Sequence, residues 1–249
     1  MLELLFIALV FLLAGYVKGV IGMGLPTIAM ATLGLLLEPV QAAAILVIPS
    51  FITNAWQFWA GGSKMATLKR LWLMLLFVCL GTWLGIGFLT SDSHVWPNIW
   101  LGSVLALYAA VALFLPKFSM PARLEGRLSP PVGLLTGILT GATGVFVMPA
   151  VPFISAMHMS KDELIAALGL SFTVSTIALA IGLGANQSLS SADLTMSLLA
   201  VLPAMAGMYI GQKTRDGIEP MMFRKWFFGA LCFLGMFMAL RAGASLLLR

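Results

Sequence analysis

Hydrophobic residues along this chain form long runs that are separated by short polar breaks. Eight such runs stand out, at residues 3–37, 40–60, 69–90, 95–115, 131–157, 164–186, 194–212 and 224–248. Most of them approach or exceed the roughly 20 apolar residues that a spanning helix needs. None shows the alternation over about ten residues that is typical of a membrane β-strand. The pattern predicts an all-α polytopic membrane protein with about eight hydrophobic segments.

Composition agrees with this class and changes how the charge is interpreted. Hydrophobic residues make up 61% of the chain and charged residues 9%, against about 45–50% and about 25% in soluble domains. The net charge of +5 does not indicate nucleic acid, because excess Lys and Arg in a membrane protein marks cytoplasmic loops. Cys79 and Cys232 lie inside apolar runs, which argues against a disulfide or metal framework. The expected setting is the lipid bilayer.

An internal repeat divides the chain nearly in half. Shifting the sequence by 122 positions superposes five glycines of the first half on glycines of the second, a sign of duplication. The pairs are Gly15 and Gly137, Gly19 and Gly141, Gly22 and Gly144, Gly62 and Gly184, and Gly85 and Gly207. We therefore expect two four-segment repeats, at residues 1–116 and 132–249, joined by a cytoplasmic linker at 117–131.

The distribution of basic residues favours repeats of opposite orientation. If all eight segments cross once, eight basic residues lie inside and five outside, with Lys18 left out of the count. If the first segment of each repeat instead enters and returns as a helical hairpin, eleven lie inside and only Arg241 and Arg249 outside. The positive-inside rule prefers the second arrangement. The prediction is an inverted repeat whose first segments are broken or re-entrant.

The first hydrophobic run contains an unusual stretch, "GYVKGVIGMGLP" at Gly15–Pro26. Glycine and proline are tolerated in membrane helices where neighbouring groups satisfy the freed backbone. The matching run at 131–157 also contains glycines and prolines. Interrupted segments at matching positions of two halves indicate a transporter binding site, and half-helix N-termini favour an anion.

Two features of this stretch allow a second interpretation. The glycines at Gly15 and Gly19 have the small-xxx-small spacing that serves helix packing. Lys18 either adds a positive charge beside the break or extends along the helix to the membrane interface, as long basic side chains do. Both readings are open at this point.

Polar residues inside the membrane gather on matching segments of the two halves. In "IPSFITNAWQ", Ser50, Asn54 and Gln57 share one helix face with Thr53, and "LSFTVST" is the counterpart in the second half. Neutral donors without carboxylates suit a weakly held anion, although hydrogen bonding between helices would use the same residues. The candidate substrate-binding residues are Lys18, Gly22, Gly24, Ser50, Asn54, Gln57, Thr143, Gly144, Ser171 and Ser175.

Catalytic and metal chemistry find little support. "GLS" at Gly169–Ser171 resembles a serine nucleophile motif, but His94 and His158 both fall near segment ends. His158, Asp162 and Glu163 are better explained as a solvated turn and helix start than as metal ligands. We expect no enzyme, no catalytic residue and no metal.

The two halves contain motifs that resemble a known family. "GYVKGVIGMGLP" followed by "EPVQAAAILVIPSFITN", and "GLLTGILTGATGVFVMP" followed by "SKDELIAALGLSFTVST", are similar to the duplicated motifs of the TauE/SafE family. Its members are bacterial membrane proteins associated with export of sulfite and organosulfonates. The usual run of adjacent glycines is replaced here by Gly22-Met-Gly24 and Gly141-Ala-Thr-Gly144, which alters the shape of the site.

The resemblance implies a multi-pass transporter of the bacterial plasma (inner) membrane that exports sulfite, an organosulfonate or a related sulfur-containing anion. No nucleotide-binding motif of the G-x-x-x-x-G-K-[ST] type is present, so no cofactor is expected and a proton gradient is the default driving force. The alternatives are an anion channel and a non-transporting assembly subunit. Whether the protein forms a homo-oligomer is left open.

Overall fold

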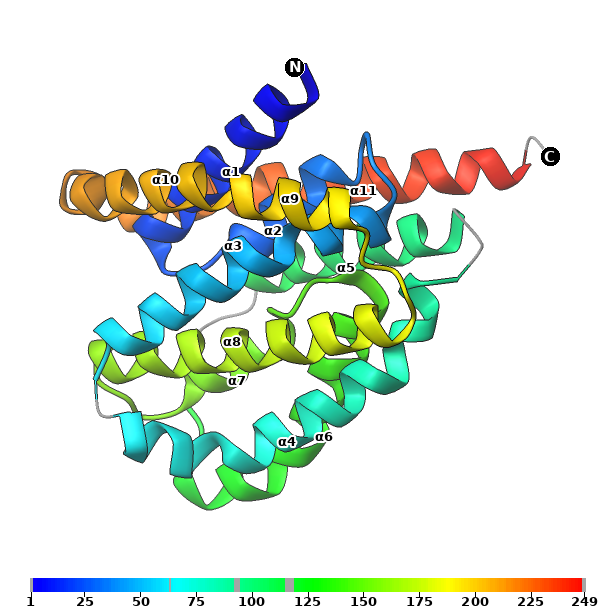
Figure 1. Cartoon of the computed structure of the whole chain (residues 1–249). Coiled ribbons are helices and arrows are strands. Elements are labelled where there is room, and N and C mark those ends of the chain that lie inside the picture. Colours follow the sequence, from blue (N-terminus) through cyan, green and yellow to red (C-terminus); the bar gives the residue numbers. More distant parts are fainter. Residues whose placement is uncertain (1, 63, 92–94, 115–118, 248–249) are drawn as a thin grey trace.

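The computed structural model describes residues 2–62, 64–91, 95–114 and 119–247, and all the regular structure in them is helical (Figure 1). The all-α class predicted from the sequence is thus confirmed. The elements are α1 Leu2–Ile21, α2 Leu25–Leu33, α3 Pro39–Ala60, α4 Lys64–Leu89, α5 Val95–Phe114, α6 Ala122–Thr143, α7 Ala150–Ala156, α8 Lys161–Ala185, α9 Ser191–Leu199, α10 Val201–Thr214, the 3-10 turn η1 Arg215–Gly217 and α11 Pro220–Leu247.

Seven stretches of the described chain are long and apolar enough to cross a membrane, one fewer than the eight predicted segments. They are Glu3–Ile21, Pro39–Ala60, Lys64–Leu89, Val95–Phe114, Lys161–Ala185, Ser191–Thr214 and Met221–Ala244. The missing segment corresponds to α6 and α7. α6 starts at Ala122, inside the stretch that we expected to be a linker, and continues through Pro130 and Pro131. Its first turns carry charged residues, so its hydropathy falls below that of the other long helices.

The first segment of each half is broken where glycine was expected to break it. α1 ends at Ile21, and Gly22 and Gly24 follow with φ of 78° and 112°, backbone that side chains rarely adopt. In the second half α6 ends at Thr143, Gly144 follows with φ of 70°, and a short irregular stretch leads to α7. Both predicted breaks are confirmed.

The seventh predicted segment is also divided. α9 ends at Leu199 and α10 starts at Val201, with Ala200 between them in a helical conformation. Pro203 has no N–H to donate to the carbonyl of Leu199, so one helix hydrogen bond is missing at this division. The apolar run at 194–212 gives no sign of this division.

Glycines bring α1 and α10 into close contact. A Cβ atom added to Gly15 or Gly19 would overlap the backbone carbonyl of Ala204 or Met208. The relation is reciprocal, because a Cβ at Gly207 would overlap the carbonyl of Leu12. The matching residue numbers rise together, so the two helices run parallel. The packing interpretation of this glycine spacing is confirmed.

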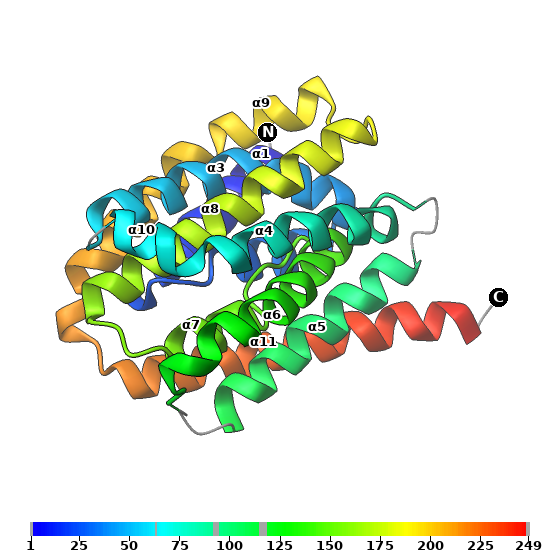
Figure 2. The ribbon, with the colours of Figure 1, turned by 90° about the horizontal axis from the view of Figure 1, so that it is seen from below.

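The same kind of contact joins α4 and α6, which lie side by side in Figure 2. Cβ atoms at Gly137 and Gly141 would overlap the carbonyls of Val78 and Thr82. These helices also run parallel. The first helix of each half therefore packs against the third segment of the other half.

The remaining long helices pair with their counterparts under the 122-residue shift, and each pair is antiparallel. α3 crosses α8, with Ser50 beside Thr176 near the middle and Gly61 against Ala166 at one end. α5 crosses α11, where the rings of Tyr108 and Phe228 are 5.2 Å apart. Corresponding helices of the two halves thus point in opposite directions.

Basic residues concentrate at one end of the helix bundle. We call the end that holds the α3–α4 connection and the starts of α6, α8 and α11 the basic end; contacts such as Gly62 N–H with the Asp162 carbonyl (3.1 Å) hold it together. We call the opposite end, which holds Glu38 and Asp193, the acidic end. The basic end contains Lys64, Lys69, Arg70, Arg123, Arg127, Lys161, Lys213, Arg215, Arg224 and Lys225.

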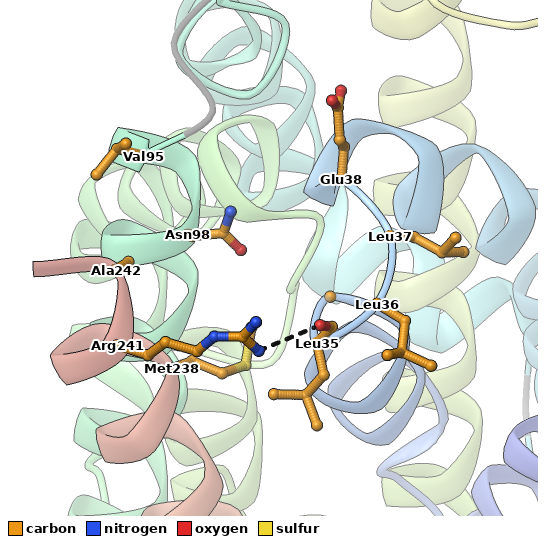
Figure 3. Close-up of a pocket in the computed structure, with 10 residues that line it drawn as sticks. Leu35, Leu36, Leu37, Glu38, Val95, Asn98, Met238, Arg241 and Ala242 are labelled. Atoms are coloured by element: carbon orange, nitrogen blue, oxygen red, sulfur yellow. Dashed lines mark hydrogen bonds between the residues drawn. The ribbon is translucent and has the colours of Figure 1, made fainter. Parts of the chain in front are cut away.

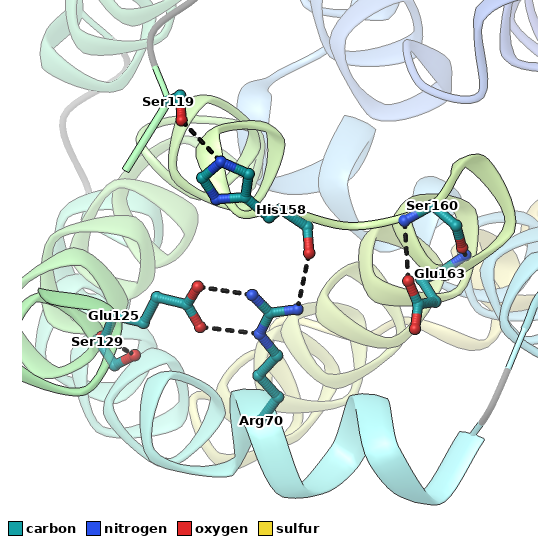
Figure 4. A network of polar contacts seen from close by, with 7 residues as sticks. All are labelled: Arg70, Ser119, Glu125, Ser129, His158, Ser160 and Glu163. Atoms are coloured by element: carbon teal, nitrogen blue, oxygen red, sulfur yellow. Dashed lines mark hydrogen bonds and ion pairs between the residues drawn. The ribbon is translucent and has the colours of Figure 1, made fainter. Parts of the chain in front are cut away.

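One ion pair closes the basic end (Figure 4). The guanidinium of Arg70 on α4 donates two hydrogen bonds to the Glu125 carboxylate on α6, at 2.8 and 2.5 Å, and a third to the His158 carbonyl at 3.2 Å. Such a two-point contact is geometrically specific. It joins α4, α6 and the segment before α8.

A buried lysine beside a helix break

Lys18 lies in the last turn of α1 and is buried inside the protein, with only 2% of its surface exposed. Its ammonium donates to Asn54 Oδ1 and, at 3.3 Å, to Thr53 Oγ1, both on α3. The side chain therefore points into the bundle. The interpretation in which Lys18 reaches the membrane interface is wrong.

All hydrogen-bond partners of Lys18 in the described structure are neutral. The one ion pair found among the described residues, Arg70 with Glu125, lies elsewhere at the basic end. A lysine at the centre of a membrane helix costs about 2.5–3.5 kcal/mol on insertion scales. Each hydrogen bond to a charged group stabilises the folded protein by about 1.5–3 kcal/mol. The C-terminal end of α1 also favours a cation. The buried charge is tolerated without a carboxylate.

A chain of hydrogen bonds leads from this lysine across α3 to α8. Asn54 Nδ2 donates to Ser50 Oγ at 2.9 Å, and Ser50 Oγ lies 3.2 Å from Thr176 Oγ1. The Thr176 hydroxyl donates to the carbonyl of Phe172 at 2.7 Å, so it accepts from Ser50. The predicted polar face is thus a connected row of donors that links three helices.

Gln57 attaches the same helix to the first break. Its Nε2 donates to the Gly22 carbonyl at 2.9 Å and to the Ile165 carbonyl of α8 at 3.4 Å. Its Oε1 is buried and has no hydrogen-bond partner among the described residues. The Gln57 side chain therefore connects the break to α3 and α8, and its carbonyl oxygen remains free to accept a hydrogen bond.

Two buried hydroxyl groups of α8 also lack partners. Ser171 Oγ and Ser175 Oγ have no hydrogen bond within the described residues, although neighbouring Thr173 and Thr176 bond their own helix carbonyls. An unsatisfied buried donor costs about 1–3 kcal/mol, so such groups need an explanation. The serines are one helical turn apart and leave two donors available to a ligand.

The polar chain extends from the basic end toward the middle of the bundle. At 1.5 Å per residue, Lys18 is about 5 Å from the end of α1 and Asn54 about 9 Å from the end of α3, whereas Thr176 is about 22 Å from the start of α8. The charged member therefore lies nearest to the basic end.

The structure separates some of the predicted site residues from this cluster. Gly144 lies against Met30 of α2 and Ala43 of α3. The hydroxyl of Thr143 donates to the Leu139 carbonyl at 2.6 Å and accepts from the Val145 N–H at 3.2 Å. These contacts stabilise the second break and give Thr143 no described contact with Lys18.

Sequence reasoning left out two members of the cluster. Thr53 and Thr176 were seen on the polar faces but were not chosen as site residues. The i, i+3 spacing of Ser50 and Thr53 was the available signal for the first. The 122-residue shift pairs Asn54 with Thr176, and that signal points to the second.

The other predicted chemistry has a simple structural explanation. Glu163 accepts the Ser160 N–H at 2.8 Å and forms a capping box that starts α8, and the His158 ring contacts Ser119 at 3.0 Å. In the part of the chain that the structure describes, no group of three His, Cys, Asp or Glu residues is arranged to hold a metal ion. His94 lies outside the described residues.

Two cavities open at the two ends of α11. One, of about 400 Å³, lies at the acidic end between the α2–α3 connection, the start of α5 and the end of α11, where Arg241 reaches the Leu35 carbonyl at 3.5 Å (Figure 3). The other, of about 220 Å³, lies at the basic end beside the first break. Lys18 lines neither of these two cavities.

Comparison with known protein families places the chain. The model of the sulfite exporter TauE/SafE family matches residues 7–238. No significant match was found among curated proteins or among solved structures. The fold therefore defines a multi-pass helical membrane protein, and the protein belongs to the TauE/SafE sulfite exporter family. This is a family of membrane transporters for sulfur anions.

Proposed function

We propose that this protein is a secondary transporter that exports a small sulfur-containing oxyanion, sulfite or an organosulfonate, through a site centred on Lys18. The observation that supports the proposal most is the buried ammonium whose partners are all neutral. An anion entering the site would supply the charge that the protein does not. Membership of the sulfite exporter family favours a sulfur-containing anion as the substrate.

The surroundings of Lys18 suit a ligand that must bind and then leave. At about 4 Å and an effective dielectric constant of about 20, one opposite charge contributes about 4 kcal/mol. The hydroxyls and amide of the row through Ser50 add neutral hydrogen bonds, and Ser171 and Ser175 on the same helix as Thr176 keep two hydroxyls that are unpaired within the described residues. A site with one cation and no carboxylate attracts the anion without holding it permanently.

The opposite directions of corresponding helices support an inverted repeat, with residues 1–116 and 132–249 as the two units and 117–131 between them. The concentration of basic residues at one end supports a cytoplasmic placement of that end. Both termini then face the other side. The broken first segments meet the description of transporter sites between inverted repeats.

In this assignment the protein resides in the bacterial plasma membrane and has no bound cofactor. Export against a gradient needs an energy source, and we assign the proton gradient to that role. The protein's expected partners are the small anionic substrate and the lipids of the bilayer.

Transport by purified protein in liposomes tests the proposal against its main alternative. Liposomes loaded with unlabelled sulfite or methanesulfonate should accumulate the labelled anion transiently by counterflow, which is a property of carriers. An anion channel would instead give single-channel currents and no saturable exchange. Absence of any anion flux, with protein shown to be folded, would leave an assembly subunit as the better assignment.

A further inference from the structure

The cavity at the basic end has an unusual lining for a space inside a membrane protein. Of about 220 Å³, it is formed by the last residues of α1, the break, η1 and the first turns of α11. The residues are Val20, Ile21, Met23, Arg215, Ile218, Arg224 and Phe228. Two guanidinium groups share it with apolar side chains, and no carboxylate occurs among these residues. The cavity is therefore positively charged.

Contacts with its walls hold Arg224 in place. Its Nη2 donates to the Ala112 carbonyl of α5 at 3.1 Å, and its guanidinium lies 5.8 Å from the centre of the Phe228 ring. Phe228 is itself packed edge-on against Tyr108. These contacts use one N–H group and one face of the guanidinium, so several donors remain for a ligand. Neither Arg224 nor Arg215 has an ion-pair partner among the described residues.

The break connects this cavity to the buried lysine along the chain. Ile21 and Met23 line the cavity, and the carbonyl of Gly22 between them accepts from Gln57 Nε2 of α3. The N–H of Gly22 donates to the carbonyl of Lys18 at 2.7 Å. A change in the backbone of this one glycine-rich turn would therefore alter the wall of the cavity and the support of Lys18 together.

We propose that this cavity is a separate binding site for a sulfonate or sulfite anion, which receives the substrate at the basic end before it reaches Lys18. The proposal rests on the function proposed above. Guanidinium groups bind planar arrays of oxygen atoms through paired hydrogen bonds better than lysine does. A volume of about 220 Å³ equals roughly seven waters at about 30 Å³ each, so a small oxyanion fits with part of its hydration.

The geometry also explains why charge is divided between two places. A concave site of one sign raises the local concentration of oppositely charged ligands by about 10-fold to 10³-fold. Arg215 and Arg224 are both half-buried, so an anion can reach them with little rearrangement. Lys18 is enclosed. The anion binds first in the cavity and then at the enclosed site around Lys18, from which it is transported.

Cysteine reactivity in the purified protein tests the charge of the cavity without a transport assay. In a background where Cys79 and Cys232 are replaced by Ser, Ile218→Cys introduces a thiol into the lining. For each thiol, the rate of modification by an anionic methanethiosulfonate reagent is divided by the rate for a cationic one. This ratio should be about 10-fold higher for the introduced thiol than for a free thiol in solution. Arg215→Gln and Arg224→Gln should each reduce this preference several-fold. The matched control is Arg127→Gln, an exposed arginine of the same end, which should leave it unchanged.

Occupancy is then tested by protection of the same thiol. Methanesulfonate should slow its modification in a saturable manner, and potassium gluconate at equal ionic strength should not. Either Arg→Gln change should weaken protection about 10-fold, whereas Lys18→Met should preserve it. If methanesulfonate and gluconate slow the modification equally, the cavity is not a binding site for sulfonates. Protection in a protein that transports no sulfur anion would uphold the cavity and refute the transport function.

Discussion

Replacing Lys18 with Met isolates the contribution of the buried charge. The two side chains have similar length, and Met packs well in irregular apolar surroundings. The change removes an insertion cost of about 2.5–3.5 kcal/mol and also removes two hydrogen bonds of about 1.5–3 kcal/mol each. The lost hydrogen bonds, about 3–6 kcal/mol together, exceed the insertion cost that is removed, so the thermal stability of the protein without ligand should fall modestly.

The affinity for the anion should fall much more. For an anion about 4 Å from the ammonium, an effective dielectric constant of about 20 gives about 4 kcal/mol, and 1.4 kcal/mol corresponds to tenfold in affinity. Lys18→Met should therefore weaken binding of sulfite or methanesulfonate roughly 10³-fold. Lys18→Arg keeps the charge but not the shape, and it should give an intermediate loss.

Titration calorimetry on the detergent-solubilised protein measures this effect, with Lys69→Met as the control. Lys69 is exposed at the basic end, so that variant has the same net charge as Lys18→Met and should bind like wild type. If Lys18→Met binds the anion within threefold of wild type while Lys69→Met behaves as expected, the buried ammonium is not the anion-binding group.

Three further predictions address the polar chain, the topology and the packing. Asn54→Leu should impair transport more than folding, because it disconnects Lys18 from the donor row; equal loss of expression and transport would indicate a packing role. An impermeant thiol reagent applied to intact cells should label Ser188→Cys and spare Thr214→Cys in a Cys-free background, and the reverse pattern would restore eight simple crossings. Gly19→Ala should destabilise the protein by about 1–3 kcal/mol through overpacking. Gly87→Ala, which meets nothing within 4 Å, should be neutral or stabilising by up to about 1 kcal/mol, and equal effects of the two changes would refute close contact of α1 with α10.

Much of the helical architecture could be predicted because the bilayer imposes strong rules on sequence. Long apolar runs locate α3, α4, α5, α8 and α11, and glycine with proline locates both breaks. The predicted start of the fifth segment, at residue 131, is wrong because Pro130 and Pro131 are signals that usually end a helix, whereas α6 starts at Ala122. A helix that pairs Glu125 with Arg70 beside it continues through them. Local breaking signals do not reveal such tertiary contacts.

The candidate site was predicted in part. Helical periodicity placed Ser50, Asn54 and Gln57 on one face, and the structure confirms that face. The direction of the Lys18 side chain was not predictable, because length alone lets it reach either the interface or the bundle interior. The meeting of Arg215 and Arg224 beside the first break depends on how distant helices cross, which a sequence pattern does not encode.

The most direct measurement of the central claim is a structure of the protein with its anion. Cryo-electron microscopy of the protein in sulfite or methanesulfonate, with a parallel data set in gluconate, would locate the ligand. We expect anion density within hydrogen-bonding distance of Lys18 Nζ, near the hydroxyls of Ser171 and Ser175, with Asn54 displaced from the ammonium. Density confined to other sites, with Lys18 still bonded to Asn54 at saturating anion, would contradict it.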